Sequence, residues 1–370
     1  MRRLATLLAL FGILLAAAGC GAKSSTNTSG STSGNAPAVP SAAPARAGTP
    51  AAQETITVGY TPVLIAAPLY IALDRGYFQQ EGIQINLQPI AGGTDIVAQT
   101  AAGNYNVGLG GMGPAYFNLA ARARSLNQAL TIEMVAPLHT ERPPLATPLV
   151  VSEKAYRSGE ITSVAQLKGK KVAVNAFGAT EWWLERALET GGLSERDVDV
   201  VAIPFPNIAE ALDSGAIAGA MLGEPFTTLA LRAGKVHILT NDFLDGEQPT
   251  AVYYNTGWAK THPRAAQGFM NAFLRAARDL ETGNIWNDPA TLATLQKYTT
   301  VPADVIAAAS RPHFFPDGRF NLTSLQNQER FFRQIGRLTY DQPLDFSRLI
   351  NPTYAEQAAK QLGITAGGER

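Results

Sequence analysis

From residue 55 to about residue 110, short apolar runs alternate with segments in which apolar residues recur every three to four positions. Short runs bounded by turn residues are typical of strands, and the wider spacing is typical of one face of a helix. The pattern predicts strands at 56–60, 83–87 and 106–110, and helices at 68–77 and 94–102. Alternation of this kind favours a mostly parallel sheet with helices on its faces.

A second series of the same kind follows the proline-rich stretch at 142–145. It predicts strands at 171–174, 198–203 and 219–222, and helices at 181–190 and 208–214. After about residue 254 the pattern becomes helical, and the segment 265–281 places Phe269, Phe273 and Leu280 on one face, which we interpret as a core face. The sequence therefore predicts an α/β protein with two lobes and C-terminal helices.

The two series share a weak internal repeat. Residues 102–114 align without gaps on residues 214–226, and each copy reads as a helix end, a glycine turn, a short strand and a glycine-containing loop. If the copies belong to different lobes, their loops would face each other across a cleft. A chance similarity between two βα units remains the alternative.

The N-terminus reads as an export signal. Met1-Arg2-Arg3 is positively charged, and residues 4–18 are apolar but fall short of the roughly 20 residues that span a bilayer. Small residues then lead into Cys20, a pattern that resembles the lipobox of bacterial lipoproteins, although Ala17 stands where leucine is more common. We predict a signal peptide at 1–20 and lipidation of Cys20. The alternative is a stray cysteine in an ordinary signal peptide.

Residues 21–53 are rich in Ser, Thr, Gly, Ala and Pro and contain no aromatic residue. Such a segment buries too little apolar surface to offset its chain entropy, so we expect a disordered tether. Cys20 is the only cysteine in the chain, which rules out a disulfide within it. Together these features predict an extracytoplasmic protein that a lipid anchor holds to the cell membrane.

Composition and motifs narrow the function further. The 370 residues include 30 Lys and Arg and 30 Asp and Glu, and this neutral balance gives no reason to expect nucleic acid. The histidines show no metal-ligand spacing, and the sequence contains neither a GxSxG motif nor a P-loop. We therefore expect no enzymatic activity, no cofactor and no metal. The four histidines are His139, His237, His262 and His313.

A set of motifs follows in a fixed order over about residues 55–363: 58–60, 68–72, 76–78, 81–83, 167–174, Glu224-Pro225-Phe226 and 349–354. Together they resemble the nitrate/sulfonate/taurine and thiamine-precursor binding proteins of ABC importers. The resemblance implies a type II periplasmic-binding-protein fold. Its first lobe would comprise 55–146 plus 254–366 and its second 147–253, with crossovers near 145–147 and 251–253. It also implies a monomer whose partners are a small solute and the permease and ATPase subunits of an importer.

Ligands of such sheets lie beyond the carboxyl ends of the strands, where loops lead into helix N-termini with free N–H groups. For Thr94, Asp95 and Thr180 the alternative role is helix capping. For the glycines the alternative is turn geometry, and Glu224 is equally suited to pair with a buried amide. The predicted ligand contacts are Tyr60, Thr61, Pro62, Gly93, Thr94, Asp95, Met112, Asn175, Phe177, Gly178, Thr180, Glu181, Trp182, Glu224, Phe226 and Tyr253.

Two adjacent tryptophans offer an aromatic wall. On a helix they point about 100° apart. Trp183 lies beside Leu184 and Ala187, so we interpret it as a core residue, whereas Trp182 shares a polar face with Arg186 and is directed toward the cleft mouth. Which of the two faces the cleft stays open.

The charges of these loops favour an organic solute over a bare anion. An anion site needs N–H donors and no nearby carboxylate, but Asp95, Glu181 and Glu224 all stand in candidate loops. Aromatic faces for stacking are available from Tyr60, Phe177, Trp182 and Tyr253. We expect a flat, nitrogen-bearing solute such as a thiamine-type or flavin-type vitamin precursor. The alternatives are a protein that binds sulfonate, taurine or nitrate, and a sensor lipoprotein that presents its solute to a membrane receptor.

Overall fold

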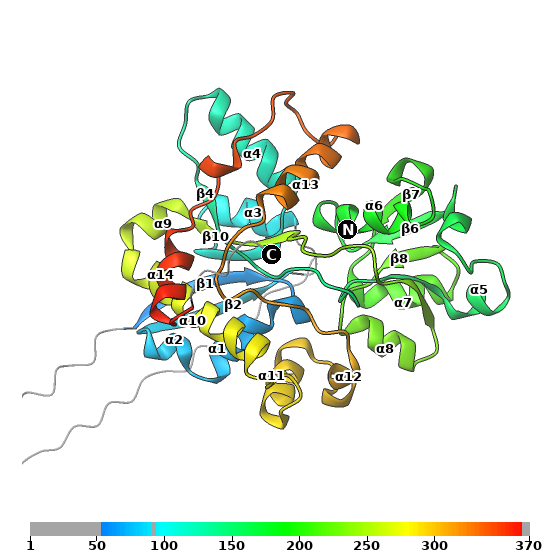
Figure 1. Cartoon of the computed structure of the whole chain (residues 1–370), viewed down its shortest axis with the longest axis horizontal. Coiled ribbons are helices and arrows are strands. Elements are labelled where there is room, and N and C mark those ends of the chain that lie inside the picture. The colour runs from blue at the N-terminus through cyan, green and yellow to red at the C-terminus, as the bar shows by residue number, and fades with distance from the viewer. Residues whose placement is uncertain (1–52, 91–93, 365–370) are drawn as a thin grey trace, which may run out of the picture. The chain divides into compact units, whose positions relative to one another are not determined.

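The computed structural model describes residues 53–90 and 94–364 (Figure 1). The predicted signal peptide, Cys20, nearly all of the predicted tether and Gly93 lie outside these residues, as does the side chain of Thr94. Among the helices of the described ranges, none combines the length and the apolar character needed to cross a bilayer.

Two five-stranded sheets form the centres of two lobes. The first lobe is built on β2 (Ile83–Pro89), β1 (Glu54–Tyr60), β3 (Val107–Gly111), β10 (Thr250–Asn255) and β4 (Ile132–Pro137), in that spatial order. The second is built on β7 (Asp199–Ala202), β6 (Lys171–Val174), β8 (Gly219–Met221), β5 (Leu149–Ser152) and β9 (Val236–Thr240).

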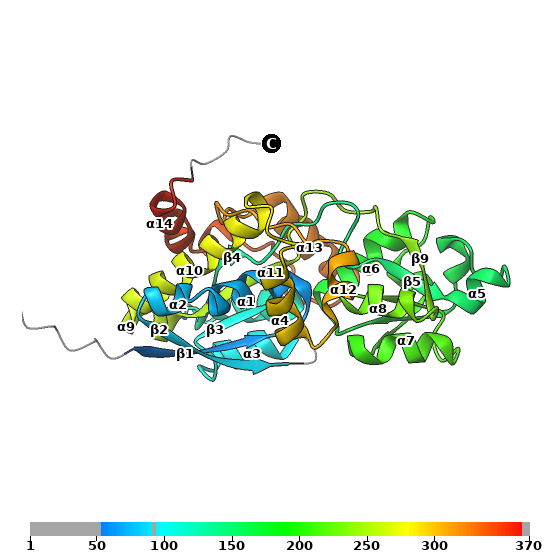
Figure 2. The same ribbon diagram turned by 90° about the horizontal axis from the view of Figure 1, so that it is seen from below.

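Helices cover both sheets, and Figure 2 shows α1, α2 and α10 together on one side of the first sheet. The α-helices are α1 (Ala67–Asp74), α2 (Tyr77–Gln80), α3 (Thr94–Ala101), α4 (Pro114–Ser125), α5 (Glu153–Arg157), α6 (Ala179–Glu189), α7 (Phe205–Asp213), α8 (Phe226–Arg232), α9 (Thr256–Thr261), α10 (Pro263–Thr282), α11 (Pro289–Thr299), α12 (Ala303–Ala308), α13 (Leu322–Gln334) and α14 (Thr353–Gln361). Short 3-10 turns are η1 (Leu64–Ala66), η2 (Val164–Leu167), η3 (Glu195–Asp197) and η4 (Phe346–Arg348).

One strand in each sheet runs against its neighbours. β1 is parallel to β2 and β3, and β6 is parallel to β7 and β8, but β10 and β5 are antiparallel to the strands on either side of them. Each reversed strand is the first one after the chain has passed from one lobe to the other. The chain enters each lobe on the side where the carboxyl ends of the parallel strands lie. The first strand after the passage therefore runs away from that side, antiparallel to its neighbours. The predicted two-lobe, mostly parallel α/β fold is confirmed.

The passages between the lobes differ in part from the predicted boundaries. The crossover expected at 251–253 lies inside β10, where Ala251 pairs with Gly110 of the first sheet, so the chain has crossed before Thr250. The first passage lies between β4 and β5, and its Leu145 N–H donates to the carbonyl of Asn241 in the second passage (2.8 Å). An apolar strand carries no local sign of which sheet it will join, so the sequence placed this boundary too late.

Helix α13 packs between the lobes. Phe332 contacts Phe117 of α4 in the first lobe, with ring centroids 6.2 Å apart, and Phe331 contacts Trp182 of α6 in the second, at 5.4 Å. One cluster of buried apolar side chains therefore runs from α4 through α13 to α6. α12 likewise lies against α8 of the second lobe in both Figure 1 and Figure 2. The segment predicted as part of the first lobe alone thus contacts both lobes.

Candidate functional site

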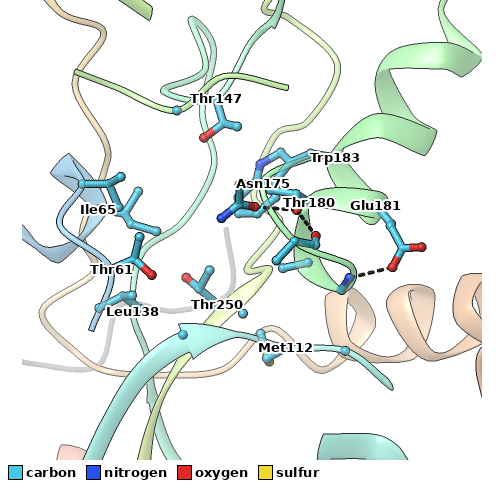
Figure 3. Close-up of a pocket in the computed structure, with 18 of the residues that line it drawn as sticks. Thr61, Ile65, Met112, Leu138, Thr147, Asn175, Thr180, Glu181, Trp183 and Thr250 are labelled. Atoms are coloured by element: carbon cyan, nitrogen blue, oxygen red, sulfur yellow. Dashed lines mark hydrogen bonds between the residues drawn. The ribbon is translucent and has the colours of Figure 1, made fainter. Parts of the chain in front are cut away.

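A cavity of about 220 Å³ lies between the two lobes (Figure 3). Thr61 and Met112 contribute to it from the first lobe, Asn175 and Thr180 from the second, and Thr147 from the first crossover. Thr61, Met112 and Asn175 directly follow the carboxyl ends of β1, β3 and β6. The cavity therefore occupies the place where doubly wound sheets bind their ligands.

The cavity brings together only part of the predicted set. Outside the lining, Asp95 is exposed on the first turn of α3, and Pro62 is half-buried beside the cavity residue Thr61. The predicted residues that line the cavity are Thr61, Met112, Asn175, Phe177, Gly178, Thr180, Glu181 and Glu224. Those that do not are Tyr60, Pro62, Asp95, Trp182, Phe226 and Tyr253.

The predicted stacking tyrosines belong to the core instead. Tyr60 packs edge-on against Tyr70, with centroids 5.8 Å apart. Tyr253 packs against Tyr116 and donates its hydroxyl to the carbonyl of Gly111 (3.0 Å). Both lie on central strands, where side chains alternate between the two faces of the sheet and pack under the covering helices. Tyr253 thereby contacts the backbone of Gly111, which lines the cavity.

The structure places the two tryptophans, whose orientation the sequence left open, in the opposite way to the interpretation of Trp183 as core. Trp183 lines the cavity, and its indole N–H donates to Oε1 of Glu141 (2.6 Å). Trp182 lies outside the lining, buried against Phe331 of α13 and beside Arg186. The polar residues beside Trp182 predict a face open to the cleft, but Phe331 of α13 packs on Trp182, and no residue near α6 in the sequence indicates that contact.

Two helix N-termini meet in the cavity from opposite lobes. α4 begins after Gly113 and α6 begins after Gly178, and a methyl group on Gly113 would lie 3.2 Å from the Cα of Gly178. Helix N-termini carry unpaired N–H groups and partial positive charge. Both ends therefore favour an oxygen of the solute, whether a carbonyl or an anionic group.

Polar side chains face the cavity from three sides. The hydroxyl of Thr180 lies 2.7 Å from both Oδ1 of Asn175 and the carbonyl oxygen of Ala176, and Nδ2 of Asn175 points into the space opposite Thr61 (Figure 3). The hydroxyl of Thr147 faces the same space. Within the described part of the chain, no side chain or carbonyl pairs with the Asn175 Nδ2 or with the Thr61 and Thr147 hydroxyls. These groups are free to bind a solute.

Glu224 lines the cavity, and its carboxylate pairs with buried amides, as one of the two roles predicted for it requires. Its carboxylate accepts hydrogen bonds from the backbone N–H and hydroxyl of Thr228 (3.0 and 2.9 Å) and from the backbone N–H of Ser310 (3.2 Å). Burial raises the pKa of Glu224, and the hydrogen bonds from Thr228 and Ser310 oppose that shift. The Ser310 contact ties the second lobe to the C-terminal segment.

A second carboxylate at the cavity is paired with a cation. Oε2 of Glu181 accepts the N–H of Gly178 (2.6 Å), and Oε1 accepts from Nε and Nη2 of Arg337 (3.0 and 2.6 Å). Burial raises the pKa of Glu181, and the Arg337 charge opposes the shift. Arg337 also lines the cavity and was missed by the sequence analysis.

A buried polar network supports the wall formed by Trp183. His139 Nδ1 lies 2.6 Å from the hydroxyl of Thr250, and its Nε2 lies 2.8 Å from Oε1 of Glu141, the atom that accepts from Trp183. Thr250, on the strand that follows the second passage, lines the cavity too. In the described ranges no group of His, Cys, Asp and Glu is placed to hold a metal ion.

Thr147, Trp183 and Arg337 line the cavity but are absent from the predicted ligand contacts. Thr147 lies in a predicted crossover. Because crossovers border the cleft in any two-lobe fold, its position in the sequence is enough to predict that it lines the cavity. Trp183 was interpreted as core from its apolar neighbours. Arg337 carries no local signal, because its partner Glu181 lies 156 positions away.

Among protein-family models, the one described as "NMT1-like family" matches residues 49–295 of this chain. The chain belongs to the NMT1-like family. It is 24% identical to the nitrate/nitrite binding protein NrtA of Nostoc sp., over 76% of this chain and 67% of that protein. It is 26% identical to the riboflavin-binding protein RibY of Chloroflexus aurantiacus, over 66% and 68%. The chain thus spans about two thirds of the length of these relatives.

Solved structures show the same fold. The alkanesulfonate-binding protein SsuA of Xanthomonas axonopodis pv. citri, bound to MOPS, matches with a TM-score of 0.62 and 19% identity, over 80% of this chain and 97% of that one. The desulfurization enzyme DSZB matches with a TM-score of 0.59 and 16% identity, over 84% and 99%. The fold is that of the type II periplasmic binding proteins, the solute-binding proteins of ABC importers, and it also occurs in an enzyme.

Proposed function

We propose that this protein is the solute-binding component of an ABC importer and that its solute is a small, uncharged, single-ring nitrogen heterocycle, of the class of pyrimidine vitamin precursors. The observation that carries this proposal is the cavity between the lobes, whose walls are mostly apolar and whose free polar groups are Thr61, Thr147 and Asn175. Hydroxyl and amide groups pair with the ring nitrogens, amino groups and carbonyls of a heterocycle.

The cavity volume favours one ring over several. At about 220 Å³ it is smaller than the roughly 300–1,000 Å³ that is typical of sites for drug-sized ligands. The three fused rings and side chain of a flavin need more room than this. We therefore favour the thiamine-type precursor over the flavin type within the predicted class.

The lining also argues against a bare inorganic anion. Val63, Leu109 and Leu138 offer no hydrogen bond to replace lost water, and Arg337 is already paired with Glu181. A short organic sulfonate is the second candidate, because the N-termini of α4 and α6 suit its anionic head and the apolar walls suit its carbon chain.

The cellular setting follows from the N-terminal sequence and the family. We propose that Cys20 carries a lipid that holds the protein to the outer face of the cell membrane, where it would deliver its solute to a permease driven by an ATPase. Neighbouring genes for a permease and an ATPase would support import. A locus without them would favour the sensor lipoprotein.

Isothermal titration of the purified protein tests the solute class. The panel is 4-amino-2-methylpyrimidine, riboflavin, taurine, a short alkanesulfonate and nitrate. We expect the pyrimidine to bind most tightly, with riboflavin and nitrate giving no measurable heat. Binding of the sulfonates alone would overturn the heterocycle in favour of the second candidate. Failure of the whole panel, with no small molecule co-purifying by mass spectrometry, would overturn solute binding at this site.

A further inference from the structure

Arg337 connects the two lobes at the edge of the cavity. Its backbone carbonyl accepts a hydrogen bond from Nδ2 of Asn118 on α4 of the first lobe (3.0 Å). Its guanidinium reaches the second lobe, where it pairs with Glu181 of α6 and lies 4.8 Å from the centre of the Phe177 ring. Arg337 therefore contacts α4 of the first lobe through its backbone and α6 of the second lobe through its side chain.

Glu181 is a carboxylate that needs this partner. Its side chain is fully buried, and a buried carboxylate without a nearby positive charge is strongly unfavourable and attracts cations. With Arg337 in place, both of its oxygens already accept hydrogen bonds, one of them from Gly178. Figure 3 shows the carboxylate turned away from the polar groups of Thr61 and Thr147.

We propose that Arg337 determines the charge selectivity of the cavity: by pairing with Glu181 across the closed lobes, it makes the site accept uncharged and anionic ring compounds and reject cationic ones. The proposal rests on the proposed function and specifies which solutes that site takes. Arg337 is a specificity-determining residue in this view, and no contact between its side chain and the solute is required.

The surrounding charges support this role. Glu195, on η3, lies with its Oε1 3.7 Å from Nη2 of Arg337. Burial and the neighbouring Glu181 raise the pKa of Glu195 to about 8, so it holds a proton at neutral pH and Arg337 balances Glu181 alone. The other carboxylate in the lining, Glu224, is occupied by Thr228 and a backbone N–H.

Three ring compounds of one shape and different charge test the proposal: benzoate, benzamide and benzamidine. Titrated into the full-length wild-type protein, benzamide and benzoate should bind at least about tenfold more tightly than benzamidine. In Arg337→Gln, the unpaired Glu181 should weaken benzoate about tenfold relative to benzamide and strengthen benzamidine. Arg333→Gln is the matched control, because Arg333 pairs with Glu329 on the same helix and does not line the cavity.

The double variant Glu181→Gln/Arg337→Gln separates charge from structure. It leaves no unpaired charge, so it should fold and regain the wild-type order of the three probes. Equal weakening of all three probes in Arg337→Gln, or a double variant that keeps the altered order, would overturn the charge role while leaving solute binding intact. If the wild type binds none of the three probes but binds the pyrimidine, the charge role fails and the proposed function stands, whereas failure to bind either overturns both.

Discussion

At the residue scale, the cavity depends on side chains whose orientation other segments fix. Trp183 is held by Glu141, and Asn175 is held by Thr180, so each presents one defined group to the solute. A binding group whose rotamer is fixed before binding loses less entropy when the solute arrives. Solute recognition in this chain therefore depends on partners outside the cavity as well as on the lining itself.

The two adjacent tryptophans allow a matched test. Trp183→Phe removes the indole N–H bond to Glu141 and part of the cavity wall, so we expect solute affinity to fall by about tenfold or more. Trp182→Phe changes a side chain outside the lining and should leave affinity within about twofold. Isothermal titration of both variants with the same solute gives the comparison, and equal losses would contradict the assignment of Trp183 to the wall.

Glu195 predicts a dependence of stability on pH. Burial first, and then Glu181 and Glu185, raise its pKa to about 8, against the opposing charge of Arg337. Between the unfolded pKa of about 4.5 and this value the folded state binds more protons than the unfolded state, so this group makes stability fall as pH rises from about 5 to 8. The melting temperature of Glu195→Gln relative to that of the wild type should therefore be higher at pH 8 than at pH 5. A constant difference at pH 5 and 8 would contradict the raised pKa.

At the element scale, the site is formed where strand ends and helix starts from opposite lobes come close together. The last residue of β3, Gly111, faces the first residue of α6, Ala179, and a methyl group on Gly111 would lie 2.7 Å from the Ala179 Cβ. Both atoms are Cβ atoms bonded directly to the backbone. Neither can move without a shift of β3 or α6. The absence of a side chain at Gly111 therefore permits this close approach of β3 to α6.

Gly111→Ala should therefore hold the lobes apart. We expect it to weaken solute binding by at least about tenfold. In small-angle scattering we expect the radius of gyration of the wild type to decrease when solute is added, and that of Gly111→Ala to stay constant. Gly219→Ala on β8 is the control, since its added methyl would first meet the Leu167 side chain, at 3.2 Å within the second lobe, and Gly219 does not line the cavity. Normal affinity and compaction in Gly111→Ala would contradict this account of closure.

At the scale of the whole molecule, the two passages between the lobes form one hinge region with a polar interior. Glu141 in the first passage binds His139 and Trp183, and His139 binds Thr250 beyond the second. A bridge between Leu145 and the second passage adds to these contacts. The side chains that border the solute and the segments about which the lobes rotate therefore belong to one network.

Removing Glu141 should destabilise the whole molecule. Glu141→Ala leaves the buried Trp183 and His139 donors without an acceptor, for which we expect a loss of about 2–4 kcal/mol in the free energy of unfolding. Thr250→Val removes one bond of the network and should cost about 1 kcal/mol. Urea denaturation measures both values. A Glu141→Ala variant as stable as wild type would show that the network contributes nothing.

The sequence by itself determined the alternation of strands and helices, the two-lobe architecture and the loops that lead into α4 and α6. These follow from local periodicity and from glycine positions, which short stretches of chain encode. Only the tertiary structure decided that β10 joins the first sheet, that Trp183 rather than Trp182 faces the cavity, and that Arg337 neutralises Glu181. Periodicity reports that a face is buried but not which distant segment buries it, and each of these features depends on contacts between segments far apart in the chain.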